Sequence, residues 1–195
     1  MYRFFLAAVD TIPAAVVLVP VFIALYFKHD NRDLKKCALY CTFCLYLCVM
    51  FVLVGIPNVK YFRPEVTLNL IPFKGMVQDL KNGILNVILF VPLGLLLPVL
   101  WQNFRRMGTC VAFGLGLSFT IELLQMLTFR ATDVNDLLTN TAGTLLGFLL
   151  AKGLAARIHA AGEGRREALC LTALSFAVMF FVHPFLSPLI WDRIL

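Results

Sequence analysis

Six apolar runs follow one another along the chain, separated mostly by short polar stretches. They lie near residues 11–27, 37–56, 84–101, 109–128, 136–156 and 168–187. A helix that crosses a bilayer needs roughly 20 mostly apolar residues, and these runs meet or approach that length. The pattern predicts an all-α fold, a polytopic transmembrane helical bundle of about six spanning helices. We expect a single transmembrane domain over residues 1–195.

Composition leads to the same prediction independently of the pattern. Hydrophobic residues make up 61% of the chain, charged residues 14%, and the mean hydropathy is +0.86, values that soluble globular domains do not reach. Because helices and turns use nearly all of the 195 residues, we expect no separate soluble domain. The first apolar run continues to Phe27 without a small-residue cleavage site, so we expect a retained helix rather than a removed signal peptide.

Lysine and arginine are unevenly distributed between alternate loops. Ten of the 17 lie in loops 28–36, 102–108 and 152–167, and the other seven lie on the opposite side of the expected bundle. Short loops rich in these residues stay in the cytoplasm, so we expect both termini outside. The long 57–83 connection is the exception to the short loops, and it includes a candidate membrane-dipping segment near residues 68–73. The net charge of +6 fits contact with anionic lipid, and no basic stripe with interleaved aromatic residues points to nucleic acid.

Polar residues inside the fourth and fifth apolar runs are the strongest sign of function. One set has the spacing i, i+4, i+7 and forms a single stripe of a helix: Ser118, Glu122 and Gln125. A second set has the spacing i, i+4, i+7, i+11: Asp136, Asn140, Gly143 and Gly147. Polar groups that face lipid lack hydrogen-bond partners, so we expect the two stripes to face each other or a shared cavity. Under the expected orientation this site opens to the outside, within the outer leaflet.

Several of these residues also have structural explanations. Asp133 can cap the fifth helix, and Asp136 can favour the positive end of the helix dipole, with Arg130 as an ion-pair partner of either. The two glycines of the second stripe have the small-residue spacing that lets transmembrane helices approach closely, so helix packing is their expected role. Glu122 differs, because neither capping nor packing needs a carboxylate two turns inside an apolar helix. We therefore expect Glu122 to be functional.

Four sequence blocks resemble the VanZ-like membrane protein family. They are L-N-L-I-P-F at 68–73, N-V-I-L-F-V-P-L-G at 86–94, S-F-T-I-E-L-L-Q at 118–125, and R-A-T-D-V-N-D-L-L-T-N-T-A-G at 130–143. Their order and spacing make the resemblance specific, and it covers a VanZ-like core of about residues 68–150. The resemblance implies a bacterial cytoplasmic membrane protein and an association with low-level resistance to teicoplanin, a glycopeptide with a lipid tail. It implies no settled mechanism.

The polar residues and the resemblance together suggest a ligand site. A polar pocket in the outer leaflet lies at the depth of lipid headgroups and suits an amphiphile, whose tail the apolar helix faces would hold. We expect a membrane lipid or a lipid-tailed glycopeptide as the ligand, and a role in glycopeptide resistance or in the handling of envelope lipids. The candidate pocket residues are Asn69, Asn86, Ser118, Glu122, Gln125, Arg130, Asp133, Asp136 and Asn140.

A membrane-embedded enzyme acting on an envelope lipid is the alternative that these residues leave open. Paired carboxylates can act as general acid and base, and Glu122 with Asp136 is such a pair. No strong nucleophile or His-x-x-x-His spacing accompanies them, and of the three histidines only His183 lies on the expected outer side. A divalent cation on these oxygen ligands is chemically reasonable, but we expect no metal and no cofactor. The sequence does not fix the oligomeric state.

Overall fold

Helices make up almost all of the described structure. The computed structural model describes residues 7, 9–28, 33–60, 68–69, 71–73, 79–127, 132–155, 160, 162 and 164–194. The chain divides into two compact units, of which unit 1 comprises Met1–Phe62 and Arg166–Leu195 and unit 2 comprises Arg63–Arg165. The all-α prediction is confirmed, with one sheet of two short strands added to it. The expectation of a single transmembrane domain stays a prediction.

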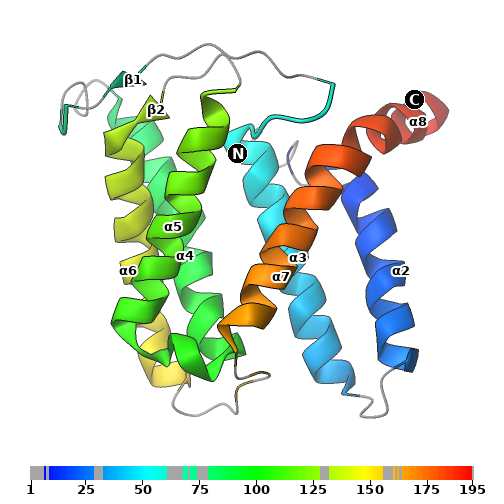
Figure 1. The fold of residues 1–195 in the computed structure, drawn as a ribbon, viewed down its shortest axis with the longest axis horizontal. Coiled ribbons are helices and arrows are strands. Elements are labelled where there is room, and N and C mark those ends of the chain that lie inside the picture. The colour runs from blue at the N-terminus through cyan, green and yellow to red at the C-terminus, as the bar shows by residue number, and fades with distance from the viewer. Residues whose placement is uncertain are drawn as a thin grey trace. The chain divides into compact units, whose positions relative to one another are not determined.

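Unit 1 joins helices from the two ends of the chain (Figure 1). Its elements are α2 (Ile12–Lys28), α3 (Leu34–Val54), α7 (Arg165–Ala177), the π-helical turn η2 (Val178–Val182) and α8 (His183–Ile194). The sequence predicted the last apolar run as one helix, whereas a π-helical turn divides it. Helix α3 begins after Asp33, whose carboxylate accepts a hydrogen bond from the Lys36 N–H at 3.0 Å. It ends at Gly55, which adopts a left-handed conformation with φ 67°.

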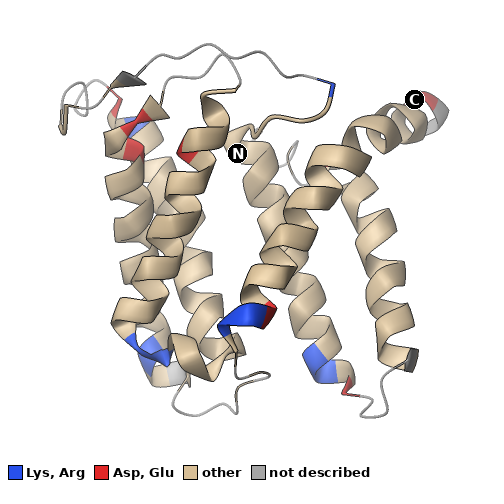
Figure 2. Ribbon diagram, in the orientation of Figure 1, with Lys and Arg blue, Asp and Glu red and all other residues tan. Residues whose placement is uncertain are grey.

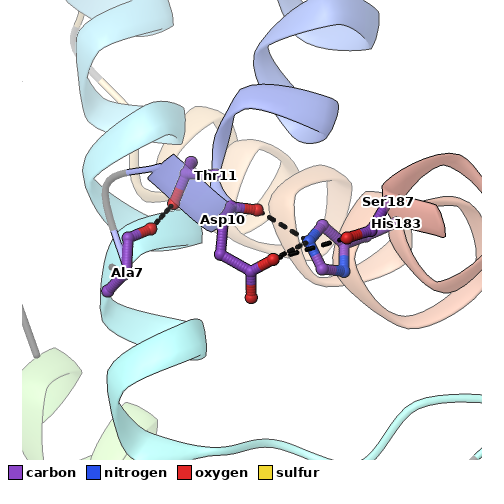
Figure 3. A network of polar contacts seen from close by, with 5 residues as sticks. All are labelled: Ala7, Asp10, Thr11, His183 and Ser187. Atoms are coloured by element: carbon purple, nitrogen blue, oxygen red, sulfur yellow. Dashed lines mark hydrogen bonds and ion pairs between the residues drawn. The ribbon is translucent and has the colours of Figure 1, made fainter. Parts of the chain in front are cut away.

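Two polar clusters connect elements within unit 1. Near the start of α2, His183 Nε2 lies 2.7 Å from the carbonyl oxygen of Asp10 and 3.7 Å from its carboxylate, and the Ser187 hydroxyl donates to the same carboxylate at 3.4 Å (Figure 3). Pairing with His183 lowers the pKa of the Asp10 carboxyl, against the opposing effect of burial. At the start of α7, Glu167 accepts a hydrogen bond from the Tyr40 hydroxyl at 2.6 Å. His183, the histidine expected on the outer side, is therefore engaged within unit 1.

Unit 2 is built on three helices, α4 (Leu80–Leu100), α5 (Met107–Gln125) and α6 (Val134–Ala155). The 3-10 turn η1 (Gln102–Arg105) joins α4 to α5, and α6 packs most extensively against α4. Strands β1 (Leu68–Asn69) and β2 (Thr132–Asp133) pair in parallel, with Asn69 opposite Asp133. Figure 1 shows this small sheet at the end of the unit where α5 ends and α6 begins. The segment near residues 68–73, expected to approach the membrane, thus lies in part against the start of α6.

Glycines set the close approach of α4 and α6. A Cβ atom added to Gly143 would collide with the carbonyl oxygen of Val87, and one added to Gly147 would collide with that of Val91. A Cβ on Gly94 would lie only 2.9 Å from the Phe148 nitrogen. The neighbouring atoms belong to the backbone, so they cannot move aside as a flexible side chain does. Gly143 and Gly147 thus lie where α4 and α6 approach each other closely.

In the part of the chain that the structure describes, four helices are long and apolar enough to cross a membrane, which identifies a multi-pass membrane protein. They are Leu34–Val54, Leu80–Leu100, Met107–Gln125 and Arg165–Asp192, while the apolar helix Ile12–Phe27 is shorter. Helix α6 has 22 residues but is not among the four. Its first two turns carry Asn135, Asp136, Thr139 and Asn140. The prediction of six spanning helices is therefore confirmed only in its coarser form.

Candidate functional site

The two polar stripes predicted from spacing meet between α5 and α6. The side-chain nitrogen Nδ2 of Asn140 donates a hydrogen bond of 2.8 Å to the hydroxyl oxygen of Ser118. Ser118 is fully buried and Asn140 is 3% exposed. One turn further along α5, Glu122 is also buried. The expectation that the stripes face each other is confirmed for this pair.

Glu122 connects the end of α5 to the strand that precedes α6. Its carboxylate oxygen Oε2 accepts a hydrogen bond of 3.0 Å from the backbone N–H of Asp133, and its carbonyl oxygen accepts one of 3.0 Å from the Thr132 hydroxyl. Both donors lie in β2. The sequence argument that no structural role uses this carboxylate is therefore incomplete. It considered helix caps and helix packing but not a bond to a returning loop.

Asp133 serves as the predicted cap and also holds β1. Its oxygen Oδ1 accepts a hydrogen bond of 2.8 Å from the Asn135 N–H in the first turn of α6. Its other oxygen, Oδ2, accepts one of 3.0 Å from the side-chain nitrogen of Asn69. The sheet register, which places Asn69 opposite Asp133, brings these two side chains together. Asn69, Glu122 and Asp133 thus form one connected group.

Phe73 extends this group in a way that the sequence did not predict. Its backbone N–H donates a hydrogen bond of 2.7 Å to the side-chain oxygen of Asn135. Phe73 has φ 63°, the positive-φ region that bulky side chains rarely adopt, and its side chain is 69% exposed. The backbone strain is therefore held by the bond to Asn135 and not by burial of the ring. Strained backbone of this kind gathers at functional sites.

Phe73→Gly is expected to stabilise unit 2 by about 0.5–1 kcal/mol. A left-handed conformation costs an ordinary residue roughly 1–2 kcal/mol, and the greater freedom of glycine in the unfolded chain offsets part of that gain. The measurement is the midpoint of thermal unfolding in one detergent. Ile71→Gly is the matched control, since Ile71 is similarly exposed and is not among the described positive-φ residues. If both variants lower the midpoint alike, the strain at Phe73 is not significant.

The remaining predicted residues that the structure describes lie on α4, α5 and α6. Gln125 is buried at the end of α5, Asp136 is half-buried in the first turn of α6, and Asn86 is half-buried on α4. Arg130 lies outside the described residues. The structure adds polar side chains that the sequence analysis missed, all of them buried on α6: Asn135, Thr139 and Thr144. Their i, i+4 spacing with each other or with Asn140 was the signal available.

Asn140 leaves one atom of the site unexplained. Among the described residues, its side-chain oxygen Oδ1 is the one buried side-chain nitrogen or oxygen without a hydrogen-bond partner. Its amide nitrogen is already used on Ser118. A buried acceptor without a partner costs roughly 1–3 kcal/mol, so such atoms call for an explanation. The oxygen can accept a hydrogen bond from a further group.

Charge is separated along unit 2. Four described acids, Asp79, Glu122, Asp133 and Asp136, lie at the end of the helices that carries β1 and β2, together with Lys81. Figure 2 shows the acids at this end and a group of basic residues at the opposite end, where the chain places Arg105, Arg106 and Lys152. The described residues contain no group of three or more His, Cys, Asp or Glu side chains placed to hold a metal ion. The carboxyl groups of this acidic end can accept hydrogen bonds.

Comparison with known proteins identifies relatives of this chain. Residues 38–156, more than half of the chain, match the family described as VanZ/LLP1, a region that includes the predicted core and the whole candidate site. The chain is 44% identical over 87 residues to Protein VanZ of Enterococcus faecium. That stretch is 43% of this chain and 52% of the relative, so the match spans about half the length of this curated relative. No solved structure matches the chain.

Proposed function

Because this chain belongs to the VanZ/LLP1 family, we propose that its polar site binds the headgroup of a membrane amphiphile. The site is the group of Glu122, Ser118 and Asn140 with the residues of β1 and β2 that join it. The bound amphiphile is an envelope lipid or teicoplanin, whose lipid tail lies along the apolar helices. By this binding the protein contributes to teicoplanin resistance.

The burial of Ser118, Glu122 and Asn140 between two helices supports this proposal. All three are at most 4% exposed, and two of them lie in a helix apolar enough to cross a membrane. An ionisable residue in a spanning helix is costly, about 2.5–3.5 kcal/mol at the bilayer centre on insertion scales. A role in binding explains why the chain keeps an ionisable group here in addition to its bond with Asp133.

The distribution of charge favours an outward-facing site. Basic residues hold the loops of a membrane protein in the cytoplasm, and in unit 2 Arg105, Arg106 and Lys152 lie at the end opposite to Glu122. This arrangement is part of the proposal, with the acidic end at the external surface and six helices crossing the membrane. An external site meets envelope lipids and an externally applied glycopeptide directly.

Drug susceptibility tests the proposal. We expect expression in a sensitive Gram-positive host to raise the inhibitory concentration of teicoplanin several-fold, and to leave that of vancomycin, which lacks the lipid tail, unchanged. Glu122→Gln should abolish the rise, because it replaces the acidic group with a neutral amide while keeping a side-chain oxygen that can accept the Asp133 bond. Glu167→Gln is the matched control, since it neutralises a carboxylate that pairs with Lys36 in unit 1. Equal membrane levels of the three proteins must be confirmed.

Each outcome bears on a different part of the proposal. If the inhibitory concentration of teicoplanin still rises with Glu122→Gln, resistance does not depend on this site. If the inhibitory concentrations of both drugs rise, recognition does not depend on the lipid tail. No rise for either drug contradicts the role in resistance, and binding of native envelope lipids then becomes the part to measure.

A further inference from the structure

The unpartnered oxygen of Asn140 and the charge of the surrounding end together specify what the site accepts. We infer that the site selects a headgroup that carries a primary ammonium, a positive charge with N–H donors. This inference rests on the proposed function, and it names the chemistry of the amphiphile that binds there.

The hydrogen-bonding state of Asn140 gives the first step. Its amide nitrogen donates to the Ser118 hydroxyl at 2.8 Å, while Oδ1 is buried without a partner. The amide thus has its acceptor unused and one of its donors taken. A ligand that satisfies it must donate a hydrogen bond, as an ammonium, amide or hydroxyl group does. A quaternary ammonium, which has no N–H, cannot.

The position of Asn140 relative to Glu122 gives the second step. Ser118 and Glu122 are one helical turn apart on α5, and Asn140 bonds Ser118 from α6. The unused acceptor therefore lies about one turn, or roughly 5–6 Å along the axis, from the level of the Glu122 carboxylate. A headgroup between the two helices meets two acceptors, of which one is acidic.

The charge of this end gives the third step. Glu122 and Asp136 lie on the two helices that carry Ser118 and Asn140, and the strand β2 between these helices adds Asp133. Next to these carboxyl groups a cation is favoured over an anion, more strongly in a low-dielectric site than in water. An ammonium therefore fits both requirements, since it supplies positive charge and up to three N–H donors.

Lipid retention by the full chain in detergent tests this inference. The probes are phosphatidylethanolamine, phosphatidylcholine and phosphatidylglycerol with identical acyl chains, and native mass spectrometry measures the bound fraction of each. The first two have the same net charge and differ in their N–H groups. We expect phosphatidylethanolamine to bind about tenfold more tightly than phosphatidylcholine, as a charged hydrogen bond predicts, and phosphatidylglycerol to bind most weakly.

Substitutions at Asn140 connect the preference to the unpartnered oxygen. Asn140→Leu should remove the preference for phosphatidylethanolamine over phosphatidylcholine. Asn140→Asp, which keeps an oxygen acceptor, should retain it. Ala142→Leu is the control, because Ala142 is exposed on the same helix. If Asn140→Leu does not fold, the inference is still tested by the ratio of phosphatidylethanolamine to phosphatidylcholine bound by the unaltered protein and by Asn140→Asp.

The outcomes separate this inference from the proposed function. Equal binding of all three lipids that is lost in Glu122→Gln overturns the ammonium preference and leaves amphiphile binding intact. Preferential binding of phosphatidylglycerol also overturns it. Retention of none of the lipids above the detergent background contradicts both.

Discussion

Gly147→Ala is expected to destabilise unit 2 by about 1–3 kcal/mol, the usual cost of inserting a methyl group into a well-packed core. The added Cβ would collide with the carbonyl oxygen of Val91 and lie 2.9 Å from the Leu95 nitrogen. Because both atoms belong to the α4 backbone, relief requires the two helices to separate. Separation would also loosen the contacts at Gly143 and Gly94, where the same helices approach closely.

Gly116→Ala is the matched control and should act in the opposite direction. A Cβ at Gly116, in the middle of α5, meets nothing within 4 Å. Alanine in a helix interior is more favourable than glycine by up to about 1 kcal/mol, so this variant should be neutral or slightly more stable. Both variants change one hydrogen into a methyl group in an apolar helix, and they differ only in what that methyl group meets.

Tryptophan fluorescence during thermal unfolding in detergent distinguishes the two variants. The chain has two tryptophans, and Trp101 is fully buried in unit 2. A Trp191→Phe background removes the tryptophan of unit 1, so the signal then reports unit 2 alone. Similar midpoints for Gly147→Ala and Gly116→Ala would show that α4 and α6 can separate without loss, which would contradict the close packing.

The sequence predicted helices and their facing stripes because both follow from local spacing. Apolar length located the helices, four of which, in the described part of the chain, are long and apolar enough to cross a membrane. The i, i+4 rule placed Ser118 and Asn140 on faces that do meet. The four-residue spacing of Gly143 and Gly147 likewise predicted their packing role, because it depends on a single helix face. These features need no knowledge of distant contacts.

The features that escaped prediction depend on contacts between distant segments or on irregular backbone. The pairing of β1 with β2 joins residues more than sixty positions apart, and two-residue strands have no periodicity to detect. Phe73 adopts a conformation that glycine or asparagine normally signals. The π-helical turn at Val178–Val182 ends two residues before Pro184, which has no N–H for a helical hydrogen bond, but a proline does not by itself distinguish a π-helical turn from a kink. The hydrogen bond from the Asp133 N–H to Glu122 also escaped prediction, because it forms only when the connection between α5 and α6 folds back onto the end of α5.

Glu122→Ala is expected to destabilise unit 2 by about 1–3 kcal/mol, whereas Glu122→Gln should cost less than about 1 kcal/mol. Alanine removes the acceptor of the Asp133 N–H and leaves that partly buried donor without a partner. Glutamine keeps a side-chain oxygen at the same reach. The change in charge and the change in hydrogen bonding can therefore be separated at one position.

The same fluorescence experiment measures both variants. Glu167→Ala is the control for loss of a carboxylate, and it is measured with Trp191 retained because Glu167 lies in unit 1. Glu167 is partly exposed and pairs with Lys36 at 3.5 Å, an ion pair that contributes at most about 1 kcal/mol at the surface. If Glu122→Ala and Glu122→Gln lower the stability of unit 2 equally, the carboxyl group itself holds the loop. Glu122→Gln would then not distinguish a loss of function from a loss of stability. If Gln is stable and Ala is not, loss of teicoplanin resistance in Glu122→Gln points to the carboxyl group itself, because the bond that positions β2 is still made.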